Sequence, residues 1–399
     1  MEQSARFIVE GLRSGVPYRE LSRKVVFGRE RYIEAVKRLL EGVEEGRAPS
    51  VPAYIVRAHY GEGKTHLLHS LWGMAEERDW VVTLVSLSKE TPLDRLDYFY
   101  PKMIRNTYVP GSAQPGAGKI VERALEERML AEARSIGFSA RIMALLDNLI
   151  VRNEGYEELL GDIDGEFLST ADIRRIHRQN YARPLPLPRS SLRDEAFEYM
   201  RFMDWLVRKA GYRGWLVLVD EVELIGKLGK GARSQAYGNL GRIISGALPN
   251  VISVWALAAN FYSDVLIKRN DREELPDWLA ARPKLAEYAP WCAAGVDALM
   301  EAKLLNELTQ AQIGELVAQI HALHQEAYGW SAPFDAVDLL AQVRRFSPAQ
   351  DTRLRTYVRL ALTILDIWQQ YGEAPTIASL AALTDEPLDE APQWEAGGE

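Results

Sequence analysis

The 399-residue chain has little of several features that would define a protein class. A single cysteine, Cys292, excludes an internal disulfide framework, suits a reducing cytoplasm, and is expected to be packed rather than reactive. Six scattered histidines and no cysteine pair provide no ligand pattern for a protein-bound metal centre. Apolar runs are short, and Met1-Glu2-Gln3 does not begin a basic-then-apolar leader. We therefore expect a cytoplasmic protein with no membrane span.

Outside two segments, the chain also has little excess of charge of either sign. The net charge is −8, but Glu373–Glu399 carries seven acids and no Lys or Arg, so the rest of the chain is near neutral. We expect residues 373–399 to form an acidic flexible tail, with a short helix around Ile377–Leu383. The segment Ala171–Arg193 has six arginines against one acid, with Tyr181 among them. Such a segment can follow a nucleic-acid backbone, although a solvated basic face or a subunit contact is the more ordinary explanation.

The most informative stretch that is present runs from Ala53 to Glu77. An apolar strand pattern, Ala53–Ala58, leads into a glycine-rich loop, and a helix pattern follows at once. The residues expected to surround a nucleotide phosphate here are Tyr60, Gly61, Glu62, Gly63, Lys64, Thr65 and His66. In such a loop Lys64 reaches the β- and γ-phosphates, Thr65 holds Mg²⁺, and the helix N-terminus adds positive charge. Ala58 stands where the pattern G-x-x-x-x-G-K-[ST] has its first glycine, which leaves the loop geometry open.

Two further strand patterns end in polar side chains. The apolar run Trp215–Val219 is followed by Asp220 and Glu221, at the position where open α/β sheets place their ligands. We expect Asp220 to assist Mg²⁺ binding and Glu221 to orient or activate the attacking water. The run from Val251 ends in Asn260, which either senses the γ-phosphate or simply caps a turn.

These anchors divide the chain into four parts. Residues 1–50 form a lead-in, and residues 51–299 form the nucleotide-binding core, which includes a helical insertion at about 92–210. In that insertion we expect helical runs such as Ile120–Ile136 and no strand. Residues 300–372 are expected to be a wholly helical lid, in which Thr309 and Gln312 form a capping box. The acidic tail, 373–399, completes the chain.

Taken together, these elements resemble an AAA+ ATPase of the origin-recognition and STAND-like branch. Gly28 and Arg29, followed by Glu30, resemble the Gly-Arg-Glu box that lies near the adenine in that branch. More narrowly, the chain resembles the ATP-binding protein family of BREX phage-defence systems, of the C and D type. The matching elements spread over nearly the whole chain: Ile8–Pro17, Phe27–Glu30, Tyr60–Leu68, Glu90–Leu93, Leu218–Glu223, Ile320–Gly329 and Leu354–Arg359.

The resemblance implies an α/β fold with an AAA+ P-loop core, a parallel sheet, a helical insertion and a C-terminal helical lid. It also implies ATP and Mg²⁺ as cofactors, ATP hydrolysis, and a homo-oligomer that assembles with other defence-system proteins or, without sequence preference, on DNA. Two alternatives stay open: a low-turnover ATP-gated switch or scaffold that recruits defence effectors, and a DNA-bound transposition or replication regulator. Asp220, Glu221 and Asn260 favour the ATP-hydrolysing module, whereas the lack of a recognisable DNA-reading module after the lid favours the switch.

An arginine is also expected near the γ-phosphate, because hydrolysis needs positive charge there. The family usually has a Pro-Arg pair in the lid, whereas this chain has Thr352-Arg353-Leu354-Arg355, so Arg353 and Arg355 are both candidates. We favour Arg355, which shares a predicted helix face with Arg359. Candidates for an arginine supplied across a subunit boundary, which the sequence does not rank, are Arg269, Arg272 and Arg282.

Overall fold

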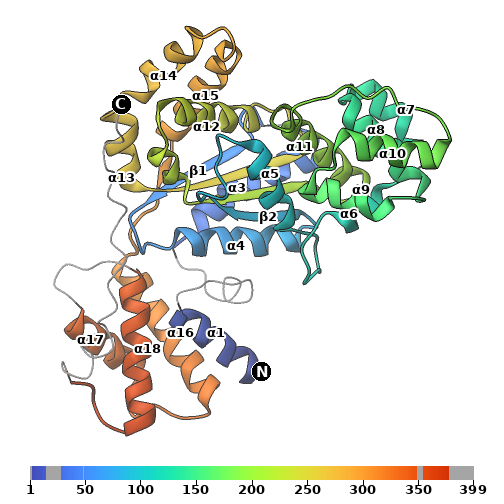
Figure 1. The fold of residues 1–399 in the computed structure, drawn as a ribbon. Coiled ribbons are helices and arrows are strands. Elements are labelled where there is room, and N and C mark those ends of the chain that lie inside the picture. Colours follow the sequence, from blue (N-terminus) through green and yellow to red (C-terminus); the bar gives the residue numbers. More distant parts are fainter. Residues whose placement is uncertain (1, 15–27, 48, 127, 348–353, 377–399) are drawn as a thin grey trace.

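A six-stranded sheet lies at the centre of the computed structural model, which describes residues 2–14, 28–47, 49–126, 128–347 and 354–376 (Figure 1). The strand order is β3-β2-β4-β5-β1-β6. The strands are β1 (Ala53–Ala58), β2 (Val81–Ser86), β3 (Thr107–Tyr108), β4 (Trp215–Asp220), β5 (Val251–Ala258) and β6 (Lys303–Leu304). Only the β2–β3 pair is antiparallel among these strands. The predicted α/β class with a parallel sheet is thereby confirmed.

The two central strands, β4 and β5, are buried along their whole length. Their near-continuous apolar sequences follow from this position, because a parallel strand with helices on both faces has no solvent side. Alternate residues face different cores: Trp215 and Val217 belong to one hydrophobic cluster, whereas Leu216 and Leu218 belong to another. The carboxyl ends of β1, β4 and β5 therefore meet at one edge of a rigid sheet, in a register that pairs Ala58 with Ala258.

Helices cover both faces of the sheet, and further helices lie beyond it (Figure 1). The helix α4 (Lys64–Glu77) contacts β2, β4 and β5, and α3 (Glu30–Glu44) packs on α4. On the other face and beyond it lie α5 (Leu96–Arg105), α11 (Leu192–Lys209), α12 (Lys230–Ile243), α13 (Ala259–Phe261), α14 (Asp271–Ala280) and α15 (Ala289–Met300). Short one- or two-turn helices complete this part: η2 (Val222–Lys227), η3 (Tyr262–Ile267) and η4 (Ala286–Tyr288).

The chain between β2 and β4 is mostly helical and projects to one side of the sheet (Figure 1). Besides α5 and α11 it holds α6 (Gly118–Ala124), α7 (Met129–Ile136), α8 (Ala140–Val151), α9 (Tyr156–Gly161), η1 (Asp162–Glu166) and α10 (Thr170–Tyr181). Its centre contains a buried ion pair in which Arg141 Nη2 donates to Asp162 Oδ2 at 2.6 Å, while Arg141 Nε donates to the Tyr199 hydroxyl at 2.6 Å. These bonds compensate the cost of burying the two charges.

Two details differ from the sequence predictions. The predicted helical run Ile120–Ile136 is divided into α6 and α7. Short strands also occur where only helices are expected: β3 lies within the insertion, and β6 lies after residue 300. Each of these strands has two residues, which is too few for any alternation to be visible in the sequence.

The lid is a separate helical cluster made from both ends of the described chain (Figure 1). It contains α16 (Gln310–Tyr328), α17 (Ala336–Phe346) and α18 (Leu354–Tyr371), and α1 (Glu2–Ser14) packs on α16 and α18. Arg13 Nη2 of α1 donates to Asp366 Oδ1 at 2.7 Å, and the same oxygen lies 3.0 Å from His324 Nε2. The predicted capping box of Thr309 and Gln312 is confirmed. The structure thus assigns α1 to the packing of the lid, while α3 packs with the core.

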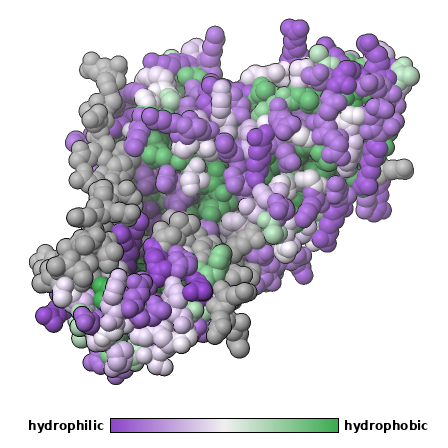
Figure 2. Space-filling view, turned by 60° about the horizontal axis from the view of Figure 1, so that its bottom comes forward, coloured by the Kyte–Doolittle hydropathy of each residue, from purple (hydrophilic) through white to green (hydrophobic). Residues whose placement is uncertain are grey.

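Among the described residues, no helix is both long and apolar enough to cross a membrane. Figure 2 shows one face of the molecule, on which hydrophilic side chains predominate and hydrophobic ones form small areas between them. Cys292 is fully buried, and burial raises the pKa of its thiol to about 12, so the side chain is packed in its thiol form. Residues 377–399, including the helix expected at Ile377–Leu383, and Arg353 lie outside the described residues.

Candidate functional site

The loop between β1 and α4 is shaped by two glycines. Gly61 and Gly63 have φ of 81° and 87°, in the left-handed region where a Cβ would be strained. Ala58, by contrast, is the last residue of β1, and its side chain is fully buried against the core. Because Ala58 lies in ordinary strand conformation, the loop does not need glycine at this position. The departure from the glycine pattern therefore leaves the loop geometry intact.

Arg29 joins this loop to the chain that follows the neighbouring strand β6. Its guanidinium, 2% exposed, donates from Nη2 to the Glu62 carbonyl at 2.5 Å and from Nη1 to the Asn306 carbonyl at 2.7 Å. Burial lowers the pKa of Arg29, but a guanidinium stays charged at physiological pH. The Glu62 carboxylate turns back into the loop and accepts from the His59 backbone N–H at 2.8 Å. Both side chains thus support the backbone of the loop.

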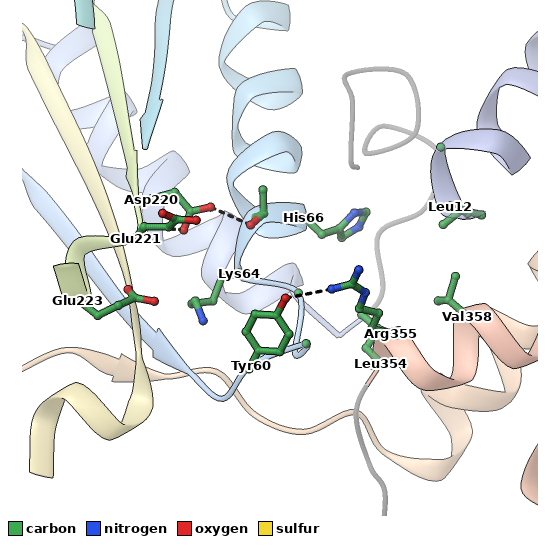
Figure 3. A pocket seen from close by; sticks show the side chains of 14 residues that line it. Leu12, Tyr60, Lys64, His66, Asp220, Glu221, Glu223, Leu354, Arg355 and Val358 are labelled. Carbon is green, nitrogen blue, oxygen red and sulfur yellow. Dashed lines mark hydrogen bonds between the residues drawn. The ribbon is translucent and has the colours of Figure 1, made fainter. Parts of the chain in front are cut away.

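A cavity of about 320 Å³ opens beside the loop, between the core and the lid (Figure 3). Its size is within the usual range for small-molecule pockets. It is lined by residues from the loop and α4 (Tyr60, Gly61, Gly63, Lys64, Thr65, His66), from the end of β4 and its following turn (Asp220, Glu221, Glu223), and from the lid (Gly11, Leu12, Leu354, Arg355, Val358). The predicted loop residues, except Glu62, therefore line one cavity together with both predicted acids and the favoured lid arginine.

Thr65 and Asp220 form the central contact of the cavity. The Thr65 hydroxyl donates to Asp220 Oδ2 at 2.7 Å, and the other carboxylate oxygen accepts from the Glu221 backbone N–H at 2.9 Å. This places a hydroxyl and a carboxylate, both typical Mg²⁺ ligands or partners of its water ligands, side by side at the start of α4. Lys64 Nζ, close by, is 3.4 Å from the Ala58 carbonyl and faces the cavity (Figure 3).

Glu221 is held in an unusual backbone conformation. Its φ of 57° lies in the left-handed region, which costs energy for a residue other than glycine and is often found at functional sites. Partial desolvation and, secondly, the neighbouring Asp220 carboxylate raise the pKa of Glu221. A carboxylate with a raised pKa is a better proton acceptor than a free surface carboxylate.

Glu223 is a site residue that sequence reasoning missed. It is 8% exposed, lines the cavity and accepts from the Ala258 backbone N–H at 3.0 Å, so it ties the turn after β4 to the end of β5. Burial raises its pKa, whereas the positive charge of Lys64 acts in the opposite direction. The sequence signal was its place two residues after Glu221, but only the paired strand ends reveal its contact.

Some predicted residues are not among those that line the cavity. Gly28 and Arg29 do not line it, and neither does Asn260, which lies in α13 just beyond β5. In the lid, Arg355 lines the cavity, whereas Arg359, one turn further along α18, does not.

The three candidates for a trans arginine all have partners within the chain. Arg269 Nη1 donates to the Gly226 carbonyl at 2.9 Å, and Arg272 pairs with Asp297 at 2.7 Å. Arg282 lies over the Trp278 ring, 3.6 Å from its centroid. Arg272 and Arg282 are exposed, whereas Arg269 is half-buried.

The fold and the site together have the arrangement of an AAA+ P-loop nucleotide-binding protein: a glycine loop opens a helix after one strand, acids follow another parallel strand of the same sheet, and a helical lid lies over the cavity. The fold class predicted from the sequence is confirmed. A family model described as BREX system ATP-binding protein BrxC/D matches residues 1–153 and 190–382. The chain belongs to this family.

The chain is also similar to solved structures at low identity. It resembles the Walker-type ATPase paby2304 of Pyrococcus abyssi at 10% identity and a TM-score of 0.37, over 88% of this chain and 70% of that chain. It resembles Cdc6p from Pyrobaculum aerophilum at 12% identity and a TM-score of 0.37, over 86% of this chain and 63% of that chain. It resembles domain III of the replication initiation protein DnaA from Thermotoga maritima at 13% identity and a TM-score of 0.35, over 90% of this chain and 92% of that chain. No curated protein sequence matches the chain significantly.

Proposed function

We propose that this chain binds ATP with Mg²⁺ in the cavity between the loop and the lid and hydrolyses it. The observation that carries this proposal is the 2.7 Å bond between Thr65 and Asp220 beside Lys64. It joins the end of β4 to the first turn of the phosphate-binding helix, at the point where metal and phosphate meet in P-loop enzymes. A chance glycine turn has no reason to bring these three side chains together.

The donors present fit the cofactor. Thr65 and Asp220 offer oxygen atoms, which Mg²⁺ prefers, and the remaining coordination positions of Mg²⁺ are usually filled by water and phosphate. Bound Mg²⁺ supplies positive charge that offsets the charge of the phosphates. Lys64 adds a second positive charge, and the N–H groups at the start of α4 donate toward the same place.

Glu221 and Arg355 complete the proposed hydrolytic site. Glu221, with its raised pKa, orients a water molecule and accepts its proton, while Arg355 stabilises charge on the γ-phosphate from within the same chain. Asn260 would sense the γ-phosphate only if α13, which follows β5 directly, moves toward the cavity. In trans, Arg272 is the best placed of the three arginine candidates, because it is exposed and held by a single ion pair on the surface.

The lid side of the cavity suits the base of the nucleotide. Leu12 of α1 and Leu354 and Val358 of α18 form an apolar wall there (Figure 3). An aromatic base buries favourably against such side chains. Because these three residues all belong to the lid, base binding would hold the lid near the phosphate loop. Arg29, which supports the loop from behind, would act through the loop backbone.

At the level of the cell, we propose that the chain is the cytoplasmic ATPase module of an antiphage defence complex. Family membership supports a role beside other BREX system proteins. Nucleotide state would control assembly of a homo-oligomer, a ring or partial ring, on those proteins or on DNA. A second candidate, an ATP-gated switch with little turnover, is favoured by the place of Asn260 outside the cavity lining.

Comparison of wild type with Glu221→Gln separates the two candidates. This substitution keeps the size and hydrogen bonding of the side chain but removes its charge. If the chain hydrolyses ATP, phosphate release should fall at least about a hundredfold while the affinity for ATP is kept. Wild-type protein that binds ATP but releases no phosphate, even with DNA and other proteins of the same defence system, would support the switch instead.

A further inference from the structure

The lid touches the phosphate-binding loop directly, at the first turn of α18. The Arg355 backbone N–H donates to the Gly61 carbonyl at 3.3 Å. Leu354 packs so closely on the loop that a Cβ at Gly63 would lie 3.2 Å from Leu354 Cδ2. The first turn of α18 is therefore in direct contact with the backbone of the loop.

The third contact joins two side chains. Arg355 Nη1 donates to the Tyr60 hydroxyl at 3.0 Å, across 295 residues of sequence (Figure 3). Figure 3 shows the phenol ring of Tyr60 and the guanidinium of Arg355 facing each other, and both residues line the cavity. The bond is partly buried, where it is less weakened by water than a surface bond.

Arg355 keeps donors for a ligand while it is held in this way. A guanidinium has five N–H donors in a fixed planar arrangement, and the bond to Tyr60 engages one side of it. Arg355 Nε is buried and has no hydrogen-bond partner within the described structure. An unsatisfied buried donor in a pocket commonly marks the place of a missing acceptor. Phosphate oxygens are the acceptors to which arginine binds most strongly.

The Tyr60 hydroxyl matters because arginine is a flexible side chain. Fixing its rotamers costs conformational entropy, which the binding of a ligand must otherwise offset. A hydroxyl that already accepts from the guanidinium has restricted these rotamers before the ligand arrives. Such preorganisation increases affinity for the ligand without adding a contact.

We propose that Tyr60 is a positioning residue: its hydroxyl holds Arg355 at the phosphate loop, so that the guanidinium meets the terminal phosphate of a nucleoside triphosphate. Tyr60 thus makes the pocket distinguish triphosphate from diphosphate, although it acts through Arg355. This inference rests on the proposed function, because it takes the cavity to be the nucleotide site.

Affinities for nucleotides provide a test that does not need turnover. Full-length wild type, Tyr60→Phe, Arg355→Ala and the double variant would be titrated with a non-hydrolysable ATP analogue and with ADP, using fluorescent derivatives. Tyr54→Phe is the matched control, because it removes the same hydroxyl from β1, the strand that leads into the loop, at a position that does not line the cavity. Arg355→Lys keeps the charge without the planar donors and serves if Arg355→Ala weakens the lid. Thermal unfolding would verify that each variant is folded.

The quantity to compare is the ratio of the two dissociation constants. We expect wild type to prefer the triphosphate, Arg355→Ala to reduce this preference about tenfold or more, and Tyr60→Phe to reduce it about threefold to tenfold. Tyr54→Phe should leave it unchanged. In the Arg355→Ala background, Tyr60→Phe should have no further effect, since its role passes through Arg355.

Additive losses in the double variant, or an unchanged preference in Tyr60→Phe, would overturn the inference while leaving the nucleotide site in place. Equal wild-type affinity for the two nucleotides would overturn it as well, because Arg355 would then make no γ-phosphate contact. Wild-type protein that binds neither nucleotide would remove the proposed function itself. The failure of the inference and the failure of the function therefore give different results.

Discussion

Lys64 is the single residue on which nucleotide affinity should depend most. Its ammonium lies 3.4 Å from the Ala58 carbonyl, a weak contact whose loss should cost the fold little. Replacing Lys64 with alanine removes a point charge from the phosphates, so we expect ATP affinity to fall at least about tenfold with little change in thermal stability. Lys89→Ala, at an exposed position outside the cavity, is the control. Unchanged ATP affinity in folded Lys64→Ala protein would contradict the site.

Asp204 should give the fold a measurable pH dependence. It is 3% exposed on α11, and its carboxylate accepts from the Asn250 backbone N–H at 3.1 Å, just before β5. Burial raises its pKa from an ordinary 3.8 to about 7. An acid whose pKa is raised in the folded state stabilises the fold below its unfolded pKa, and this stability is lost as pH rises through the folded pKa.

The unfolding free energy should therefore decrease between about pH 4 and pH 7, by at most about 4 kcal/mol from this group. In Asp204→Asn the amide oxygen can still accept from Asn250, and the decrease over this range should be smaller. Urea unfolding at several pH values would measure both, with the exposed Asp194→Asn on the same helix as control. Parallel pH profiles for wild type and Asp204→Asn would contradict this assignment.

Single residues were predictable where their chemistry is local. The glycine loop, Lys64 and Thr65 lie within a few residues of one another, and Asp220 and Glu221 directly follow a recognisable strand. The contact of Glu223 with Ala258 depends on how two strands pair, and the contact of Tyr60 with Arg355 joins residues 295 apart in the sequence. No periodicity or short motif records such a pairing, which is why these roles needed the fold.

Among the elements, Arg29, at the start of α3, joins the loop after β1 to the chain after β6. Its guanidinium bridges the carbonyls of Glu62 and Asn306, and a lysine could reach at most one of them. We expect Arg29→Lys to leave one buried carbonyl unpaired, to cost about 1–3 kcal/mol of unfolding free energy, and to weaken ATP binding.

Denaturant unfolding together with ATP titration tests this role. The neighbouring Arg31→Lys is the matched control, since Arg31 is exposed and donates to the side chain of Asn306. If Arg29→Lys lowered ATP affinity with no loss of stability, Arg29 would have to touch the nucleotide, as the resemblance to the origin-recognition branch implies.

Long elements with clear periodicity were also predictable. The four strands that end at or near the site are six to eight residues long and mostly apolar, and the capping box placed the start of α16 correctly. The strands β3 and β6 were not predictable, because two residues show no pattern and pairing alone defines them. The packing of α1 on the lid was not predictable either. An amphipathic helix shows that it has a partner, but its sequence does not identify that partner.

For the molecule as a whole, charge argues against a strong DNA interface on the arginine-rich segment. The chain outside the acidic tail is near neutral, whereas DNA-binding domains usually carry a basic face. In the structure, Arg175 pairs with Glu158 at 2.6 Å, and Arg174 donates to the Leu187 carbonyl. The segment also lies largely in the stretch between residues 153 and 190 that the family match omits. Two of its arginines are thus already engaged within the chain.

We therefore expect Arg174/Arg175/Arg178→Ala to change duplex-DNA binding little. DNA affinity of wild type and variant would be measured at several salt concentrations, and the two plots of log affinity against log salt should have equal slopes. A slope reduced by roughly 0.9 for each arginine removed would instead show that these side chains neutralise phosphates. Arg183→Ala and Arg189→Ala, which remove exposed arginines nearby, test whether the rest of the segment makes such contacts. Equal slopes in all variants would leave this surface for protein partners, in agreement with a defence complex held together by protein contacts.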